Sequence, residues 1–308
     1  MKSQIAELSN YQFIKVEGPD FRKFLQGQLS CNMEKLAAEH SLRGAICNLK
    51  GIVIADLRVL QLGDGCLLQV DSGMAQPVVA TLAKYAVFSK VKLTILDGHP
   101  APLGLLGAPG SQVQQLFAQL PEAIDAVSHG DSASLIRVAG TPPRYELWFH
   151  DKAAQLAFSA SLPSSLMVNI SAWQRAEMQA GVIHVDSSKT ETYTPQLLNY
   201  DISGVIDFKK GCYTGQEVVA RMFYRGSAKK RMYLASTLTP LHTDPGVQQT
   251  VANEEKNSEI LACSNAPEGS NEPTLLLTVL DTEAVETGGS FTLAHYPEVK
   301  LSILPLHY

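Results

Sequence analysis

The order in which strand-like and helix-like patterns alternate constrains the fold of this 308-residue chain more than any other feature. Alternating apolar residues predict strands, and apolar residues spaced by three or four predict helices. In the first hundred residues these patterns loosely follow the order β-α-β-β-α-β. Strands are predicted at 11–16, 45–49, 52–62, 66–70 and 91–96, and helices at 21–29 and 72–85.

The same order returns, again loosely, in the second hundred residues. Strands are predicted at 103–107, 134–138 and 145–149, and helices at 111–120, 152–162 and 171–180. This order is typical of a ferredoxin-like split βαβ unit rather than of a doubly wound parallel sheet. The chain is therefore predicted to be an α+β protein with two such units.

The pattern changes after about residue 226. Short strands are predicted at 232–238, 259–263, 274–280 and 300–304, with turn residues between them and little helical periodicity. Such a series is typical of a small β-barrel or sandwich. The polar, acidic stretch 253–272 is predicted to be an exposed loop within it. We therefore expect three domains, 1–100, 101–225 and 226–308.

Composition narrows the class of protein. Hydrophobic residues make up 45% and charged residues 18% of the chain, as in ordinary globular proteins. The five cysteines form no CxxC pair and the eight histidines are scattered, so neither a disulfide framework nor a metal site is expected. The sequence shows no apolar leader and no run of about 18 apolar residues. We expect a cytoplasmic, monomeric protein with reduced thiols and no membrane span.

One segment, KKGCYTGQE at 209–217, contains the residue types needed for thiol chemistry. Cys212 lies between two glycines and close to Lys209 and Lys210. A thiol reacts as its thiolate, and nearby cations lower the pKa of a thiol. The segment is therefore either a site with a functional Cys212 or a surface turn that happens to contain a cysteine.

The same part of the chain carries an unusual local charge. Residues 209–231 contain seven basic residues and one acidic residue, whereas the whole chain has a net charge of −5. Such a run is either a solvated hinge between domains or a site for an anion. The anion could be a phosphate, a carboxylate tail or an RNA backbone.

Six segments of the chain resemble one protein family. They are FLQGQL at 24–29, NLKG at 48–51, ADLR at 55–58, YAVFSK at 85–90, WQRAEMQAG at 173–181 and KKGCYTGQE at 209–217. They resemble segments of the folate-binding proteins related to the glycine-cleavage T-protein. The cysteine segment is similar to the signature of one branch of these proteins, the YgfZ group.

The resemblance implies a fold, a ligand and a role. The fold is the T-protein-like arrangement, in which two ferredoxin-like units and a C-terminal β-barrel surround a folate pocket. The ligand is tetrahydrofolate or a derivative. The role is that of an accessory protein for iron–sulfur enzymes such as a tRNA methylthiotransferase, so that any effect on tRNA is indirect. Whether such a protein is itself an enzyme is left open.

The resemblance also implies which residues form the site. Trp173 and Tyr11 would provide aromatic walls for a pterin, and Gln179 would bond the pterin edge where many relatives have a glutamate. Asp56 is the residue left from an aspartate pair of the T-proteins. Arg225, with Arg221, would bind the carboxylates of the folate tail by bidentate pairing.

At the thiol, Lys210 or Lys209 would stabilise the thiolate of Cys212. Glu217 and Arg221 would hold the loop through an ion pair four residues apart. The thiol itself could act as a one-carbon acceptor, as a redox group, or as a transient contact for a cluster or for sulfur.

Two other functions are open at this point. A folate-dependent aminomethyltransferase of the T-protein type would need an acid near the folate nitrogen, for which Asp56 is the only inherited candidate. Gln179 could not replace a glutamate as a base. The second is a tRNA-binding module that uses the basic residues 209–231, where Tyr213, Phe223 and Tyr224 are the aromatic residues available for stacking.

Overall fold

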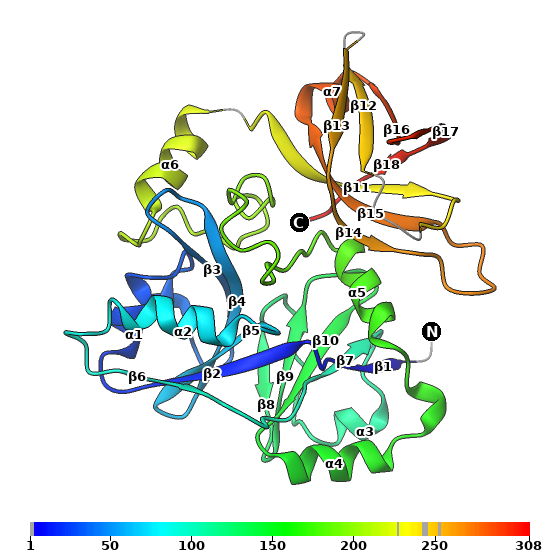
Figure 1. Ribbon diagram of the computed structural model, residues 1–308. Helices are drawn as coiled ribbons and strands as arrows, with labels where there is room; N and C mark the ends of the chain where they lie inside the picture. Colours follow the sequence, from blue (N-terminus) through cyan, green and yellow to red (C-terminus); the bar gives the residue numbers. More distant parts are fainter. Residues whose placement is uncertain (1–2, 227, 242–245, 252–253) are drawn as a thin grey trace.

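The computed structural model describes residues 3–226, 228–241, 246–251 and 254–308 (Figure 1). Its first sheet has five antiparallel strands in the order β3-β4-β5-β2-β6. Two helices, α1 (Phe21–Gln26) and α2 (Ala75–Ala83), lie on one face of this sheet. The strands are β2 (Tyr11–Glu17), β3 (Leu42–Cys47), β4 (Val53–Leu62), β5 (Gly65–Asp71) and β6 (Lys92–Ile95).

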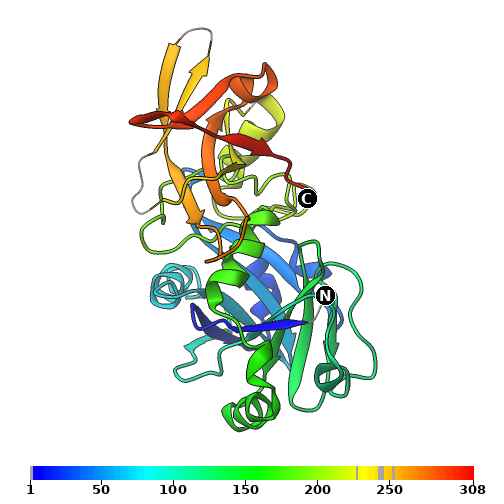
Figure 2. The ribbon, with the colours of Figure 1, turned by 90° about the vertical axis from the view of Figure 1, so that its right-hand side faces the viewer.

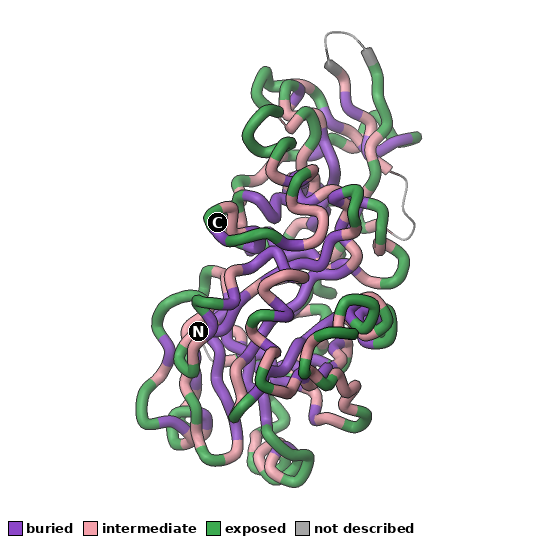
Figure 3. Tube along the Cα trace, turned by 90° about the vertical axis from the view of Figure 1, so that its left-hand side faces the viewer, coloured by how far each residue is buried: buried purple, intermediate pink, exposed green. Residues whose placement is uncertain are grey.

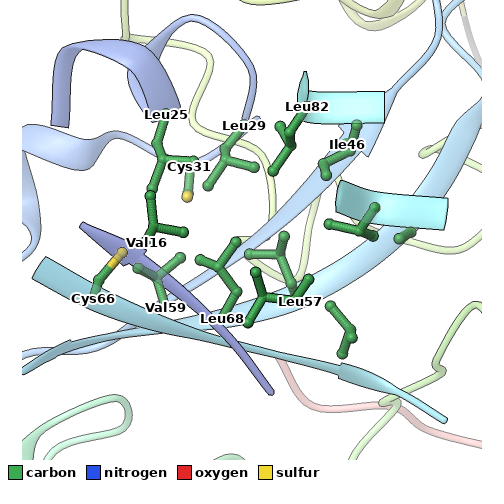
Figure 4. Packing of buried hydrophobic residues seen from close by; sticks show 14 of the residues in the cluster. Val16, Leu25, Leu29, Cys31, Ile46, Leu57, Val59, Cys66, Leu68 and Leu82 are labelled. Atoms are coloured by element: carbon green, nitrogen blue, oxygen red, sulfur yellow. The ribbon is translucent and has the colours of Figure 1, made fainter. Parts of the chain in front are cut away.

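The hydrophobic core of this first unit follows from the alternation of side chains between the two faces of each strand. Ile14 and Val16 of β2 point toward the helices and are buried with Leu25 of α1 and Leu82 of α2. Figure 4 shows this packing at Val16, Leu25, Leu29, Cys31, Ile46, Leu57, Val59, Cys66, Leu68 and Leu82. Burial of this apolar surface is the main stabilising contribution to the unit.

The second sheet also has five strands, in the order β1-β7-β10-β9-β8. Its outer face packs against α3 (Ser111–Gln114) and α4 (Lys152–Ser161). The strands are β1 (Gln4–Glu7), β7 (Leu103–Leu106), β8 (Val127–His129), β9 (Ala133–Val138) and β10 (Arg144–Phe149). The two predicted ferredoxin-like units are thus confirmed as mixed α/β units.

The inner faces of the two sheets share a core. Phe13 and Leu60 of the first sheet are buried with Ile136 and Trp148 of the second. The rings of Phe13 and Trp148 meet edge to face with centroids 5.0 Å apart. Helices therefore cover the outer faces, and the inner faces of the two sheets pack against each other. In Figure 3 the buried stretches of chain run through the interior of the molecule.

Three details of this half differ from the expected pattern. Strand β1 pairs with β7, so residues 4–7 belong to the second sheet although they were expected in the first domain. The helix predicted at 111–120 ends at Gln114, and Phe117 beyond it is buried against the second sheet. The helix predicted at 72–85 is shorter and begins after Met74. The domain boundaries themselves stay predictions.

Gly104 of β7 allows the predicted ligand residue Trp173 to lie in this core. A β-carbon at Gly104 would lie 2.6 Å from Cε3 of the Trp173 ring. We expect Gly104→Ala to lower the free energy of unfolding by about 1–3 kcal/mol, because overpacking displaces the indole. Urea unfolding measures this change. Gly110→Ala is the control, since a β-carbon there has only an ordinary contact at 3.6 Å, and equal losses in both variants would contradict the prediction.

Helix α5 (Ile170–Gln179) links the two sheets to the C-terminal half. It contacts β1 and β7 on one side and β14 and β15 on the other, and Figure 2 shows it between the two halves. A long irregular connection then leads to α6 (Gln216–Arg225). Its apolar residues, among them Tyr200 and Val205, share a core with strand β3 and with the C-terminal sheet.

The C-terminal half contains two four-stranded sheets, in the orders β14-β15-β11-β18 and β13-β12-β16-β17. They share a core with the short helix α7 (Thr282–Glu286). Closure of these sheets into the predicted barrel stays a prediction. The strands are β11 (Lys230–Thr237), β12 (Val247–Val251), β13 (Glu254–Ser258), β14 (Ile260–Ser264), β15 (Thr274–Asp281), β16 (Ser290–Leu293), β17 (Tyr296–Lys300) and β18 (Ser302–Leu304).

The expected loop 253–272 is wrong for much of its length. Asn253 lies outside the described residues, but 254–258 and 260–264 form β13 and β14. The strand predicted at 259–263 corresponds to β14, whereas β13 was not predicted, because its polar sequence is held by backbone pairing with β12 rather than by a run of apolar residues. Within the described ranges, no helix combines the length and apolar character needed to cross a membrane.

Candidate functional site

The main candidate site is a small polar cavity between the two sheets. Its volume is about 30 Å³, room for one or two water molecules. The walls come from β2, β3, β4 and β5 of the first sheet, from β9 and β10 of the second, and from α5 and the chain after it. Its ionisable residues are Tyr11, Arg43, Asp56, Arg58, Asp71, Arg144, Glu146, Glu177 and His184. So many buried ionisable groups in one cavity are typical of a functional site.

His184 is the centre of a buried ion group. Its Nδ1 lies 2.7 Å from Oδ2 of Asp56, and its Nε2 lies 3.3 Å from Oε1 of Glu177. The Tyr11 hydroxyl donates to Glu177 at 3.1 Å and lies 3.0 Å from Nε2 of His184. The backbone N–H of Val185 donates to the other oxygen of Asp56 at 2.7 Å. Four polar side chains from three parts of the chain are thereby held in one network.

The charges of this group stabilise one another. Burial lowers the pKa of His184, but the facing carboxylates of Asp56 and Glu177 outweigh burial and raise that pKa well above its usual range. For Asp56 and Glu177, burial acts to raise the pKa, but the His184 cation outweighs it and each pKa is lowered. The group is therefore an imidazolium between two carboxylates at neutral pH.

Among the carboxylates that line the cavity, that of Asp71 is the one available to interact with a ligand. Burial raises the pKa of Asp71 to about 6, with smaller contributions from neighbouring carboxylates. In the described part of the chain, no hydrogen bond or ion pair engages its side chain. Glu146, in contrast, accepts hydrogen bonds from Gln69 at 2.7 Å and from the Trp148 indole at 2.8 Å.

Arg144 links the cavity to the predicted aromatic wall. Its guanidinium lies over the Trp173 ring, 4.5 Å from the centroid, and its Nε donates to the carbonyl of Ala139 at 2.8 Å. The residue is only 2% exposed, yet its Nη1 has no hydrogen-bond partner among the described residues. A buried guanidinium N–H without a partner is costly, and it is available to an acceptor on a ligand.

The predicted pocket residues have different positions. Tyr11 and Asp56 line the cavity. Trp173 is fully buried behind Arg144 and does not line it. Gln179 is exposed on α5 and so does not reach the cavity, whereas Glu177, two residues earlier, does. Because a helix turns by 100° per residue, a register difference of two residues places a side chain on the opposite face.

The Cys212 loop lies elsewhere, against the first unit. The FLQGQL segment holds it: Thr214 donates its backbone N–H to the carbonyl of Gly27 at 3.1 Å, and its hydroxyl donates to the side chain of Gln28 at 3.1 Å. Gly215 begins α6 with a φ of +82°, and a β-carbon there would lie 2.3 Å from the carbonyl oxygen of Asn48. The segments 24–29 and 209–217, which are far apart in sequence, thus pack against each other.

Cys212 itself is exposed in a hollow of about 370 Å³ that Gly27 and Leu49 also line. A wider hollow of about 580 Å³ adjoins it, since Leu49 and Thr214 line both. Three other cysteines, Cys31, Cys47 and Cys66, are buried, and burial raises the pKa of each to about 12. Cys212 is therefore accessible to a reagent where these three thiols are not.

The residues predicted to activate Cys212 are arranged differently from the expectation. Lys210 is buried, and its ammonium donates to the carbonyls of Gln26, at 2.6 Å, and Leu29 and lies 4.9 Å from the Tyr213 ring centroid. Lys210 therefore stabilises the conformation of the loop rather than the thiolate of Cys212. Between the described side chains of Glu217 and Arg221 there is no ion pair, and both are exposed.

Arg221 and Arg225, predicted to bind a folate tail, lie exposed on α6 and do not line the central cavity. The sequence reading also missed the most informative cavity residues, namely Glu177, His184, Arg144 and Asp71. A partial signal was present, since Glu177 lies inside the segment 173–181 that carried the resemblance. The other three lie in strands or irregular chain, where nothing local marks them.

Comparison with solved structures defines the class of this fold. The glycine cleavage system aminomethyltransferase T from Bartonella henselae superimposes with a TM-score of 0.73, covering 99% of this chain and 85% of that protein. The sequences are 17% identical, so the likeness concerns the fold alone. The chain has the fold of a glycine-cleavage T-protein.

Comparison with characterised sequences identifies the family within that class. The tRNA-modifying protein YgfZ of Colwellia psychrerythraea is 32% identical over 276 residues, covering 87% of this chain and 83% of the relative. That of Klebsiella pneumoniae is 34% identical over 234 residues, covering 74% and 70%. No protein-family model matches the chain. The chain belongs to the YgfZ family of tRNA-modifying proteins.

Proposed function

We propose that this protein is a folate-binding accessory factor that supports iron–sulfur enzymes and thereby tRNA methylthiolation. The central cavity would hold tetrahydrofolate, and Cys212 would be the functional thiol. The observation that carries the folate part is the Nη1 of buried Arg144, which has no hydrogen-bond partner among the described residues, in the same cavity as the Asp71 carboxylate. A donor and an acceptor in one cavity suit the mixed polar edge of a pterin.

The chemistry of the cavity fits a pterin, whereas its present volume does not. Ligand pockets usually enclose roughly 300–1,000 Å³, and this cavity has about 30 Å³. Binding must therefore move side chains of the wall. Arg144 is the side chain best placed to move, since among the described residues its guanidinium is held by stacking on Trp173 and by one hydrogen bond.

Tetrahydrofolate, when bound, would carry a one-carbon unit. Asp71, whose pKa burial raises to about 6, would accept a hydrogen bond from the ligand or exchange a proton with it near neutral pH. Tyr11 and Glu177 would form a fixed wall, because His184 holds both. Asp56 has both carboxylate oxygens engaged, which disfavours the acid role that aminomethyl transfer requires.

The thiol part of the proposal rests on accessibility. Cys212 lies at a hollow continuous with a larger one, and the FLQGQL segment fixes the loop through backbone contacts. A thiol presented in this way can react with a partner protein's group without entering the central cavity. The chain would thus bind its ligand at one site and act on its partner at another.

Complementation tests the thiol part of this proposal. We expect the wild-type chain to restore methylthio-modified adenosine in the tRNA of a strain that lacks its own YgfZ-type protein, and Cys212→Ser to restore none. Mass spectrometry of bulk tRNA nucleosides measures the modification. Cys263→Ser, a change at an exposed cysteine of β14, is the matched control. Full restoration by Cys212→Ser would make the thiol structural, and failure of the soluble wild-type chain would refute the role.

A further inference from the structure

The C-terminal part of helix α6 and its neighbours form an exposed surface whose residues line neither the central cavity nor the Cys212 hollow. We define the α6 surface by its aromatic residues Phe208, Phe223 and Tyr224 and by its basic residues, Lys209, Arg221 and Arg225. In Figure 1 the helix lies at the outer edge of the molecule, beyond β3. The surface lies outside the residues that line the central cavity.

The aromatic side chains are arranged as a platform. Phe208 and Phe223 stack with centroids 3.8 Å apart and planes inclined by 15°. Tyr224 meets Phe223 edge to face at 5.1 Å. Phe223 is 39% and Tyr224 67% exposed. Phe208 thus holds Phe223 in place from one side, while Phe223 and Tyr224 present ring surface to the solvent.

The basic residues around the platform are not neutralised by the protein. All three are exposed, and within the described ranges none of them forms an ion pair. Two other cations of residues 209–231 are used internally, since Lys210 binds backbone carbonyls and Arg231 forms a bidentate pair with Asp201 at 2.8 Å. Three unpaired cations therefore lie on α6 or next to Phe208 in sequence, on a chain whose net charge is −5.

We propose that the α6 surface binds a single-stranded segment of RNA directly. Cations that follow a backbone and exposed rings on which bases stack are the two elements of single-strand recognition. A duplex would use the cations but leave the rings without a partner, because its bases are already stacked. An acidic protein would likewise match the charge but not the planar rings. The inference goes beyond the proposed folate role and does not depend on it.

Fluorescence anisotropy with a labelled single-stranded RNA of about 12 nucleotides tests this proposal. We expect wild-type binding that weakens steeply between about 50 and 200 mM KCl. Tyr224→Ala should weaken binding about tenfold or more through lost stacking. The double variant Arg221→Glu, Arg225→Glu should weaken it as well and reduce the salt slope by roughly 1.4, about 0.7 for each lost phosphate contact.

The matched control is Lys152→Glu on α4, at the opposite end of the molecule in Figures 1 and 2, which should bind as wild type does. Three results would overturn the proposal. The first is no measurable wild-type binding at the lowest salt. The second is equal binding of duplex RNA together with an unchanged Tyr224→Ala, which would indicate a merely cationic patch. The third is equal binding of a polyglutamate peptide, which would indicate an acidic protein partner.

Discussion

Replacing His184 by glutamine is expected to lower the free energy of unfolding by about 3–5 kcal/mol at pH 7. The imidazolium bridges Asp56 and Glu177, and the side chains of these two acids are only 7% and 8% exposed. Without the cation, two buried carboxylates face each other with no opposite charge between them. Urea unfolding followed by far-UV circular dichroism measures the loss.

The same ion group predicts how stability depends on pH. The folded pKa of His184 is raised, so its contribution is complete below about pH 6.5 and is lost as pH rises through the raised value. The folded pKa values of Asp56 and Glu177 are lowered, so their contribution is present above about pH 4 and is lost as pH falls. Asp71 acts oppositely: because its folded pKa is raised to about 6, its ionisation lowers stability progressively between about pH 4 and 6, and the full cost remains above pH 6.

Two comparisons separate this effect from a general loss of packing. His307→Gln changes an exposed histidine and should leave stability within about 0.5 kcal/mol of wild type. The double variant His184→Gln, Asp56→Asn should be less destabilised than the sum of its single changes, because the second change removes a charge that the first leaves unpaired. Additive losses, or a His184→Gln variant as stable as wild type, would show that the ion group contributes little.

The sequence predicted the fold well wherever the spacing of apolar residues matches the face that is buried in the structure. Residues 11–16 alternate because Tyr11 and Phe13 face the second sheet while Ile14 and Val16 face the helices. The pattern could not reveal that these two faces pack against different layers. It also could not place β1, because pairing of residues 4–7 with β7 depends on a partner about a hundred residues away.

The candidate site was also predictable only in part, because its residues are brought together by tertiary contacts that local sequence patterns do not show. Tyr11 and Asp56 were expected from the resemblance and do line the cavity. His184 lies in irregular chain after α5, where no periodicity marks it, and its meaning comes from two carboxylates that the fold brings to it. The docking of Thr214 on Gly27 is likewise a tertiary contact, between a segment predicted as a helix and a segment that could have been a surface turn.

The second large effect concerns ligand binding. We expect Arg144→Met to weaken the binding of tetrahydrofolate by about 10- to 100-fold, as for loss of a hydrogen bond to a charged group worth roughly 1.5–3 kcal/mol. The change removes the unpartnered Nη1 and keeps an unbranched apolar side chain on Trp173. Isothermal titration calorimetry under anaerobic conditions measures the dissociation constant.

Two further variants serve as controls for Arg144→Met. One is a change at Arg137 of the neighbouring strand, and the other is the conservative change Arg144→Lys. Arg137 of β9 also donates to backbone carbonyls, but it does not line the cavity, so Arg137→Met should bind as wild type does. Arg144→Lys should bind with intermediate affinity, because it keeps the charge without the planar fork. Since the proposed binding moves the Arg144 guanidinium away from the indole, ligand binding should also change the fluorescence of Trp173. Wild-type affinity in Arg144→Met, with unchanged unfolding, would mean that the ligand does not bind through this arginine.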